Sequence, residues 1–264
     1  MHKWSSRIAA LVVLLLVSVT SLQPGVSINA VTGWISSFPT PSSCWDMAGA
    51  GTEEDDCGSI DLTLINSPAY VSAGVDFEES ESDSMDGGAN YRGAFTSTDF
   101  TFSATINVES AAVGVIMGTQ LNSGTFRGWN FNVQADGSIR FNARETGGTD
   151  ELSLEATTTN LSTATWYNIV IAGSSSPTAS NVEIYVNGVL EAESAIADTL
   201  SSDADCATCD FEIGSISDGT HFDGINAYSR VWWGTKLNAT QAAAVCSSDA
   251  ALLTARSETP MGCT

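Results

Sequence analysis

The strongest constraint on the fold is residues 166–188, which consist of two apolar segments joined by small polar residues. In the second segment, 182–186, apolar residues alternate with others, so the apolar ones share one face of a β-strand. Asn187-Gly188 follows, and this pair favours a tight hairpin turn because both turn residues need a positive φ. Two strands and a turn cannot bury themselves in water. The stretch therefore predicts a larger antiparallel sheet.

The same two-residue period recurs elsewhere in the chain. It runs through 100–108, and through 129–134 and 139–144, which predict a second hairpin with one apolar and one polar face. One short helix is expected after Leu237, where Asn238 can cap and Gln241 completes a capping box. Many short strands, frequent turns and almost no helix predict an all-β fold, a two-sheet antiparallel β-sandwich of the jelly-roll type.

The first residues predict a targeting segment. Lys3 and Arg7 precede an apolar run at 8–17, and small polar residues follow. This is the layout of a secretory signal peptide, predicted at 1–24 with cleavage between 21 and 30. An uncleaved anchor is the alternative, but the run is too short to span a bilayer. No later run approaches membrane length, so we expect a secreted, extracellular protein without membrane insertion once the signal is removed. A linker is predicted at 25–43, the main domain at 44–246 and a C-terminal tail at 247–264.

The charge of the chain excludes some partners. Without the signal peptide, 7 Lys and Arg stand against 31 Asp and Glu, a net charge of −24. Such a protein repels nucleic acid and anionic membranes, so we expect neither as a partner.

All six cysteines lie after the signal peptide. An even number in a secreted chain predicts disulfides. Their spacing suggests Cys44–Cys57, Cys206–Cys209 and Cys246–Cys263, while crossed pairing of the first and last pairs stays open. Cys206 and Cys209 suit a zinc or redox site less well, because the chain has no second pair at zinc-binding spacing and His221 is the only histidine after the signal peptide.

The order of several short motifs carries a family resemblance. The motifs are 99–103, 128–131, 136–139, 166–170, 184–188, 211–214 and 222–225. With this order the chain resembles the laminin-G-like jelly rolls, which are concanavalin A-like lectin/glucanase and pentraxin-related domains, over residues 44–246. The resemblance implies two curved antiparallel sheets, commonly a calcium ion, and binding of glycans or extracellular proteins. Fold alone does not determine function, so each site is argued from its residues.

Calcium is the expected cofactor, because it binds carboxylate and carbonyl oxygens in loops. The acidic stretch 78–90 is predicted to be a long surface loop and supplies Asp83 and Asp86 as candidate ligands. Asp218 and Asp223 flank a second loop and complete the predicted set. The alternative is that these acids are only solvated, as is common in an acidic chain.

A ligand-binding face is predicted on the hairpin of 129–144. Its polar side carries amides and arginines that can hydrogen-bond sugar hydroxyls, and Tyr185 is expected to stack on a sugar ring. The predicted binding residues are Asn132, Gln134, Arg140, Asn142 and Tyr185, with Asn130 and Arg144 on the same side. An ordinary solvated sheet face is the alternative.

Hydrolysis is not predicted. Glycosidases need two carboxylates in different environments. The nearest pattern, Glu81, Asp83 and Asp86, is interrupted by serines that would not raise the pKa of an acid. No Gly-x-Ser-x-Gly motif is present, and His221 alone leaves no good triad base.

Two N-glycosylation sequons occur, at Asn160 and Asn238. They predict a glycoprotein in a host that glycosylates.

These observations predict a secreted, disulfide-stabilised, non-catalytic binding or adhesion module for a glycan or an extracellular protein, with calcium as the expected cofactor. A structural coat or appendage component that self-associates is the first alternative. A degenerate glycoside hydrolase is the second.

Overall fold

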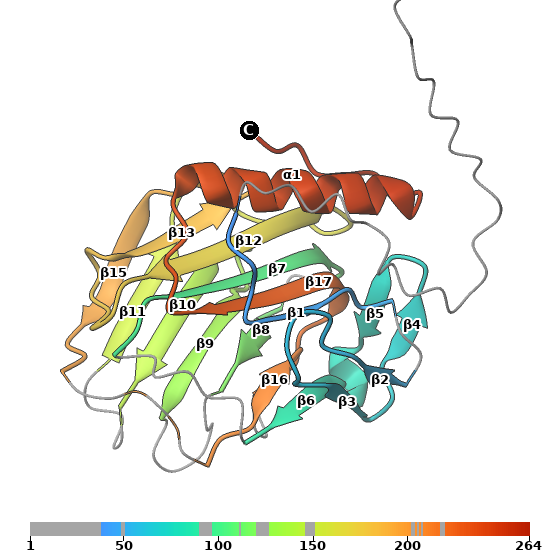
Figure 1. Cartoon of the computed structure of the whole chain (residues 1–264), viewed down its shortest axis with the longest axis horizontal. Coiled ribbons are helices and arrows are strands. Elements are labelled where there is room, and N and C mark those ends of the chain that lie inside the picture. The colour runs from blue at the N-terminus through green and yellow to red at the C-terminus, as the bar shows by residue number, and fades with distance from the viewer. Residues whose placement is uncertain are drawn as a thin grey trace, which may run out of the picture.

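Two antiparallel sheets face each other and form a β-sandwich (Figure 1). The computed structural model describes residues 38–48, 51–89, 97–110, 112–119, 127–145, 151–201, 204, 206, 208–216 and 220–264. The predicted signal peptide, most of the predicted linker and Asp218 lie outside these residues. In the described part of the chain, no helix combines the length and the apolar character needed to cross a membrane.

Sheet A is the sheet that contains the hairpin of residues 166–188. Its strands, in spatial order, are β14 (Val189–Leu190), β13 (Val182–Val186), β12 (Trp166–Gly173), β7 (Phe100–Val108), β17 (Gly224–Trp233), β5 (Gly74–Phe77) and β4 (Ala69–Val71), and β1 (Ser43–Trp45) pairs with β17. β17 pairs with β1, β5 and β7, so this sheet joins segments that are far apart in the sequence.

Sheet B is the second layer. Its strands, in spatial order, are β15 (Glu193–Asp198), β11 (Glu151–Ala156), β10 (Ile139–Arg144), β9 (Gly128–Val133), β8 (Gly114–Gly118), β16 (Phe211–Ile213), β6 (Ser84–Gly88), β3 (Leu62–Ile65) and β2 (Thr52–Glu53). A short 3-10 helix, η1 (Glu79–Glu81), precedes β6.

The hairpin predicted from Asn187-Gly188 is confirmed. The Asn187-Gly188 turn joins β13 to β14, which pair antiparallel with Val186 opposite Val189. β12 and β13 also pair antiparallel, with Ile169 opposite Val186, and the longer loop 174–181 connects them. Asn187 and Gly188 have φ angles of 53° and 81°, both in the left-handed region that this turn requires. The Asn187 side chain also accepts a hydrogen bond from the backbone N–H of Asn168, at 2.9 Å. This bond ties the turn to the neighbouring strand.

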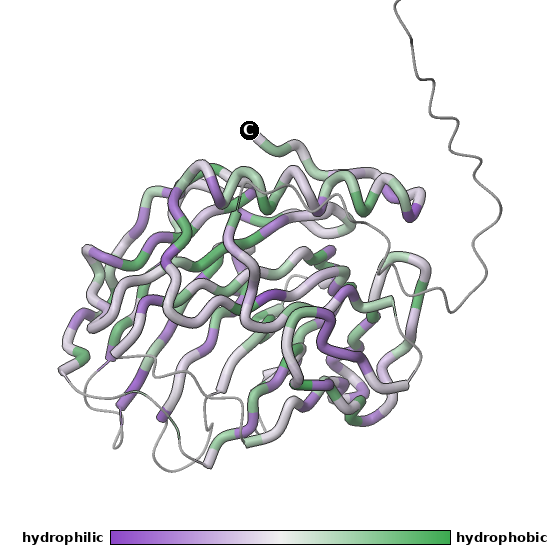
Figure 2. The backbone as a smooth tube through the Cα atoms, viewed as in Figure 1, coloured by the Kyte–Doolittle hydropathy of each residue, from purple (hydrophilic) through white to green (hydrophobic). Residues whose placement is uncertain are grey.

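The core lies between the two sheets. Along the strands, hydrophobic and hydrophilic residues alternate (Figure 2), and the apolar sides of both sheets face inward. Phe102 of sheet A stacks on Trp129 of sheet B with ring centroids 3.7 Å apart. The predicted one-sided alternation of 100–108 is therefore confirmed, and it supplies one wall of this core.

The helix α1 (Ala239–Ala255) packs on the outer face of sheet A. The predicted capping box is present, because the side chain of Asn238 accepts from the N–H of Gln241 and the side chain of Gln241 accepts from the N–H of Asn238. The predicted boundary at residue 246 is wrong, since it would cut through α1. The residues after α1 are also attached to the domain, because Met261 is buried and Cys263 is bonded to Cys246 of the helix.

Three disulfide bonds cross-link the chain. They join Cys44 to Cys57, Cys206 to Cys209 and Cys246 to Cys263, with Cα–Cα distances of 5.3, 5.3 and 5.8 Å. The pairing suggested by spacing is therefore confirmed, and the crossed alternative is excluded.

Candidate functional site

The outer face of sheet B is polar and is not covered by α1. Strands β9, β10 and β11 place their apolar residues in the core, so their alternate residues point outward. The outward residues of these strands are Asn130, Asn132, Arg140, Asn142, Arg144, Glu151, Ser153 and Glu155, and we call them the open face. The predicted residues Asn132, Arg140 and Asn142 are thereby brought together on one surface.

A hydrogen-bonded row forms the floor of the open face. Asn142 stands opposite Asn130 on one neighbouring strand and opposite Ser153 on the other. Its Nδ2 donates to Oδ1 of Asn130 at 3.2 Å, and its Oδ1 accepts from Oγ of Ser153 at 2.8 Å. All three side chains are buried. The row is therefore held together by hydrogen bonds that cross three adjacent strands.

Two ion pairs flank this row. Arg140 pairs with Glu155, and its Nε donates to Oε2 at 3.0 Å. Arg144 pairs with Glu151, with Nη2 and Oε1 2.7 Å apart. The four side chains remain between 22% and 32% exposed, so a ligand can reach them. Each arginine on the open face thus has a carboxylate partner on the next strand.

Asn132 contributes a half-buried amide to the open face. It stands opposite Arg140, and its Oδ1 is buried with no hydrogen-bond partner in the described part of the chain. The exposed part of the side chain is the part that a ligand can reach. The predicted Gln134 lies beyond the end of β9, in the turn where its backbone N–H donates to the carbonyl of Ser138.

The prediction that Tyr185 stacks on a sugar beside these residues is wrong. Tyr185 belongs to β13 of sheet A, is only 2% exposed, and packs with Val245 of α1. Its hydroxyl donates to Glu183 at 2.6 Å. Sequence periodicity placed Tyr185 on an outer face correctly, but α1 covers that face.

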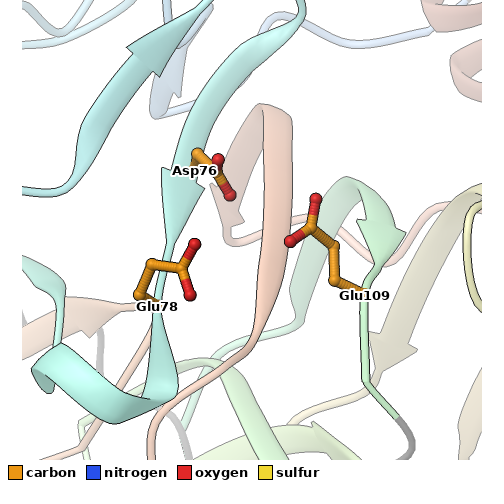
Figure 3. A group of neighbouring side chains, drawn as sticks. All are labelled: Asp76, Glu78 and Glu109. Carbon is orange, nitrogen blue, oxygen red and sulfur yellow. The ribbon is translucent and has the colours of Figure 1, made fainter.

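A second group of polar residues lies at the β5 end of sheet A. The carboxylate oxygens of Asp76, Glu78 and Glu109 lie within 4.8 Å of one another, and their side chains point toward a common space (Figure 3). We call these three residues the acidic cluster. Asp76 lies in β5, Glu78 follows that strand, and Glu109 follows β7. Asp223 precedes β17, and its carbonyl accepts from the backbone N–H of Glu109 at 3.0 Å.

The electrostatics of the acidic cluster favour a cation. Burial and the charge of Asp223 raise the pKa of the Asp76 carboxyl, and burial together with Asp76 raises the pKa of Glu109. The Oδ1 atom of Asp76 is buried and lacks a hydrogen-bond partner among the described residues. Several hard oxygens with unmet charge are what calcium prefers as ligands.

Of the four predicted calcium ligands, the three that the structure describes do not all lie together. Asp83 is 1% exposed and accepts from the backbone N–H of Glu78 at 3.2 Å, beside the acidic cluster. Asp223 also adjoins that cluster. Asp86 instead lies in β6 of sheet B, where its side chain accepts a hydrogen bond from the N–H of Gly88. Its neighbour there is Asp210, whose pKa is raised mainly by burial and secondly by the charge of Asp86. Asp218 lies outside the described residues.

The stretch 78–90 is not the long surface loop that its composition predicted. β6 runs through it between β16 and β3, and Met85 is fully buried in the core. The acids of the glycosidase-like pattern are correspondingly dispersed: Glu81 ends η1, Asp83 is buried and Asp86 lies in β6. The sequence patterns did not predict Asp76, Glu78 and Glu109 as metal ligands. A signal was present for two of them, because Asp76 and Glu78 alternate with the apolar Val75 and Phe77.

One family description matches this chain. The model of the concanavalin A-like lectin/glucanases superfamily matches residues 82–243. This span is more than half of the chain and includes every strand from β6 to β17. No curated protein matches the sequence.

Several solved structures share the fold at low sequence identity. Trypanosoma rangeli sialidase in complex with sialic acid is 15% identical, with a TM-score of 0.55 over 77% of this chain and 32% of that chain. The binding domains of botulinum neurotoxin serotypes G and D are each 14% identical, with TM-scores of 0.51 and 0.53 over 78% and 76% of this chain and 50% of each of those chains. The chain thus spans about a third of the sialidase and half of each toxin domain. At this identity the likeness concerns the fold alone.

Proposed function

The chain belongs to the concanavalin A-like lectin/glucanases superfamily, and from this premise we propose that it is a secreted, non-catalytic module that binds a glycan through its open face. An extracellular protein that carries such a glycan is a partner of the same kind. The similar structures include a sialidase that is in complex with sialic acid and the binding domains of two toxins, which is consistent with a role in recognition.

The observation that carries this proposal is that α1 covers the outer face of sheet A and leaves the outer face of sheet B uncovered. α1 buries the polar outer residues of sheet A, among them Thr105, Asn168 and Arg230. The outer face of sheet B keeps its ion pairs accessible above a hydrogen-bonded row of amides and a hydroxyl. The partly exposed carboxylates and guanidinium groups of these pairs are suited to sugar hydroxyls, which both donate and accept.

We further propose that the acidic cluster binds calcium. Asp76, Glu78 and Glu109 would supply carboxylate oxygens, with Asp83 and Asp223 close enough to contribute charge. The cluster lies on sheet A and not on the open face, so the ion would stabilise the junction of β5, β7 and β17. Its role toward a glycan would then be indirect.

Secretion is supported by two independent features. The segment 1–24 has the composition of a signal peptide. All six cysteines are in disulfides, which form and persist in oxidising compartments.

Self-association as a structural component is a second candidate. Val189 and Leu190 of β14 and Ile196 of β15 are each more than a third exposed, and these two strands are edges of their sheets. Exposed apolar edge strands can pair with another chain.

A glycan array probed with the secreted protein, in calcium and in EDTA, tests the proposal. We expect binding that the Asn132→Ala substitution weakens by about three- to tenfold, the size of one hydrogen bond. Ser247→Ala, on the exposed side of α1, is the matched control and should leave binding unchanged. No signal in either buffer would reject the glycan proposal. Concentration-dependent assembly without glycan binding would instead favour the structural role.

A further inference from the structure

The cationic side chains of this protein are almost all neutralised. Seven Lys and Arg remain after residue 24, against 31 acidic residues. Arg140, Arg144, Arg230, Lys236 and Arg256 each form an ion pair with an acidic residue. Arg127 also has a partner within the protein, and Arg92 lies outside the described residues. Five of the six Lys and Arg in the described part of the chain are therefore already paired with a carboxylate.

On the open face, the register of β10 and β11 places each arginine opposite a glutamate. Arg140 is in register with Glu155, and Arg144 is in register with Glu151, across the same pair of strands. Cross-strand pairs in register are close neighbours, so each carboxylate holds its guanidinium in place. The groups that commonly recognise sugar carboxylates and sulfates are thus already engaged by the protein.

From this arrangement we infer that the open face selects neutral, hydroxyl-rich glycans and that Glu151 and Glu155 exclude anionic ones. The inference rests on the proposed function and specifies its ligand class. A neutral sugar presents O–H donors, which suit the remaining lone pairs of the partly exposed Glu151 and Glu155. A sialyl or sulfated sugar adds negative charge that must compete with Glu151 and Glu155, in a protein that is already strongly acidic.

The test compares the affinities of neutral and anionic oligosaccharides for the same protein. The neutral probes are β-glucan and galactan oligosaccharides, and the anionic probes are sialyllactose and heparin oligosaccharides, all measured by calorimetry at low and at physiological salt. For the native protein we expect the neutral probes to bind at least about tenfold more tightly than the anionic ones, a ratio that one or two charge-assisted contacts can set.

The double variant Glu151→Gln, Glu155→Gln tests whether the two glutamates exclude anionic sugars. It frees two guanidinium groups without changing side-chain volume, so the ratio of anionic to neutral affinity should rise at least about tenfold, and the gain should shrink at high salt. Glu183→Gln is the matched control, because it frees Lys236 on sheet A, away from the open face. That variant should leave the ratio unchanged.

The outcomes separate this inference from the proposed function. If the native protein prefers the anionic probes, or if the double variant does not shift the ratio, the inference is wrong while glycan binding stands. If no probe binds either the native protein or the double variant, then both the inference and the proposed glycan binding are wrong. Near-ultraviolet circular dichroism of each variant identifies misfolding, and the single variants Glu151→Gln and Glu155→Gln then carry the test.

Discussion

Single residues determine whether the tight turn between β13 and β14 can close. Gly188 has a φ of 81°, and it also lies against α1. A β-carbon built at this position would lie 2.8 Å from Cα of Ala243 and 3.3 Å from the carbonyl oxygen of Thr264. The glycine is therefore required both by the turn and by the close approach of the helix and the C-terminus.

Gly188→Ala should lower the free energy of unfolding by about 1–3 kcal/mol, because it adds backbone strain and an overlap with α1. Urea denaturation followed by fluorescence measures the change. Gly262→Ala is the matched control, since a β-carbon there meets no atom within 4 Å. Equal stability of the two variants would contradict this account of the turn.

At the scale of elements, α1 is held on sheet A by a buried polar network. Asp249 pairs with Arg230, with Nη1 2.8 Å from Oδ2, and it accepts hydrogen bonds from Thr105 and Asn168. Both charged side chains are at most 1% exposed. Apolar contacts of Leu237, Ala242 and Val245 complete the interface. The network fixes the position of the helix along the sheet, because a shifted helix would leave charges buried without partners.

Asp249→Ala should destabilise the protein by about 3–5 kcal/mol, since the guanidinium of Arg230 would lose its buried carboxylate. Replacing both partners, as in Asp249→Leu with Arg230→Met, should restore much of this loss because no charge remains buried. Thermal unfolding of both variants measures the difference. A double variant as unstable as the single one would show that packing, and not the charge, dominates the interface.

At the scale of the whole molecule, the acidic cluster makes stability depend on pH, and the proposed calcium ion would change that dependence. Asp76 and Glu109 have raised pKa values in the folded protein, so between their ordinary and raised values the folded state binds more protons than the unfolded state. Stability contributed by these groups is therefore present at low pH and is lost as the pH rises.

In EDTA we accordingly expect the melting temperature to fall as the pH rises above the ordinary pKa values of these carboxyls, about 4, by an amount that Glu109→Gln reduces. Calcium at about 100 times its dissociation constant should stabilise the protein at pH 7.5 by about 2.7 kcal/mol. Differential scanning calorimetry with and without calcium measures both effects. Asp86→Asn, which removes an acid of sheet B, should retain the calcium response. A melting temperature that calcium does not change at pH 7.5 would rule out the proposed site.

Local patterns predicted the parts of this protein that depend on neighbours in sequence. The alternation of 100–108, the Asn187-Gly188 turn and the Asn238 cap each involve a few consecutive residues, so period and turn chemistry determine them. Cysteine spacing also suggested the three disulfides, because each joins positions at most 17 residues apart. The stretch 78–90 shows the limit of composition, since one buried Met85 outweighs its many acids and serines.

The sequence alone thus determined the fold class, the strands of the two hairpins and the set of polar residues on β9 and β10. Only the tertiary structure decided which polar face stays open, because α1 comes from the far end of the chain and covers Tyr185. It also decided that Asp76, Glu78 and Glu109 form a cluster, since the strand order places β5 and β7 on either side of β17. Strand order depends on how the whole core packs, and no short pattern encodes it.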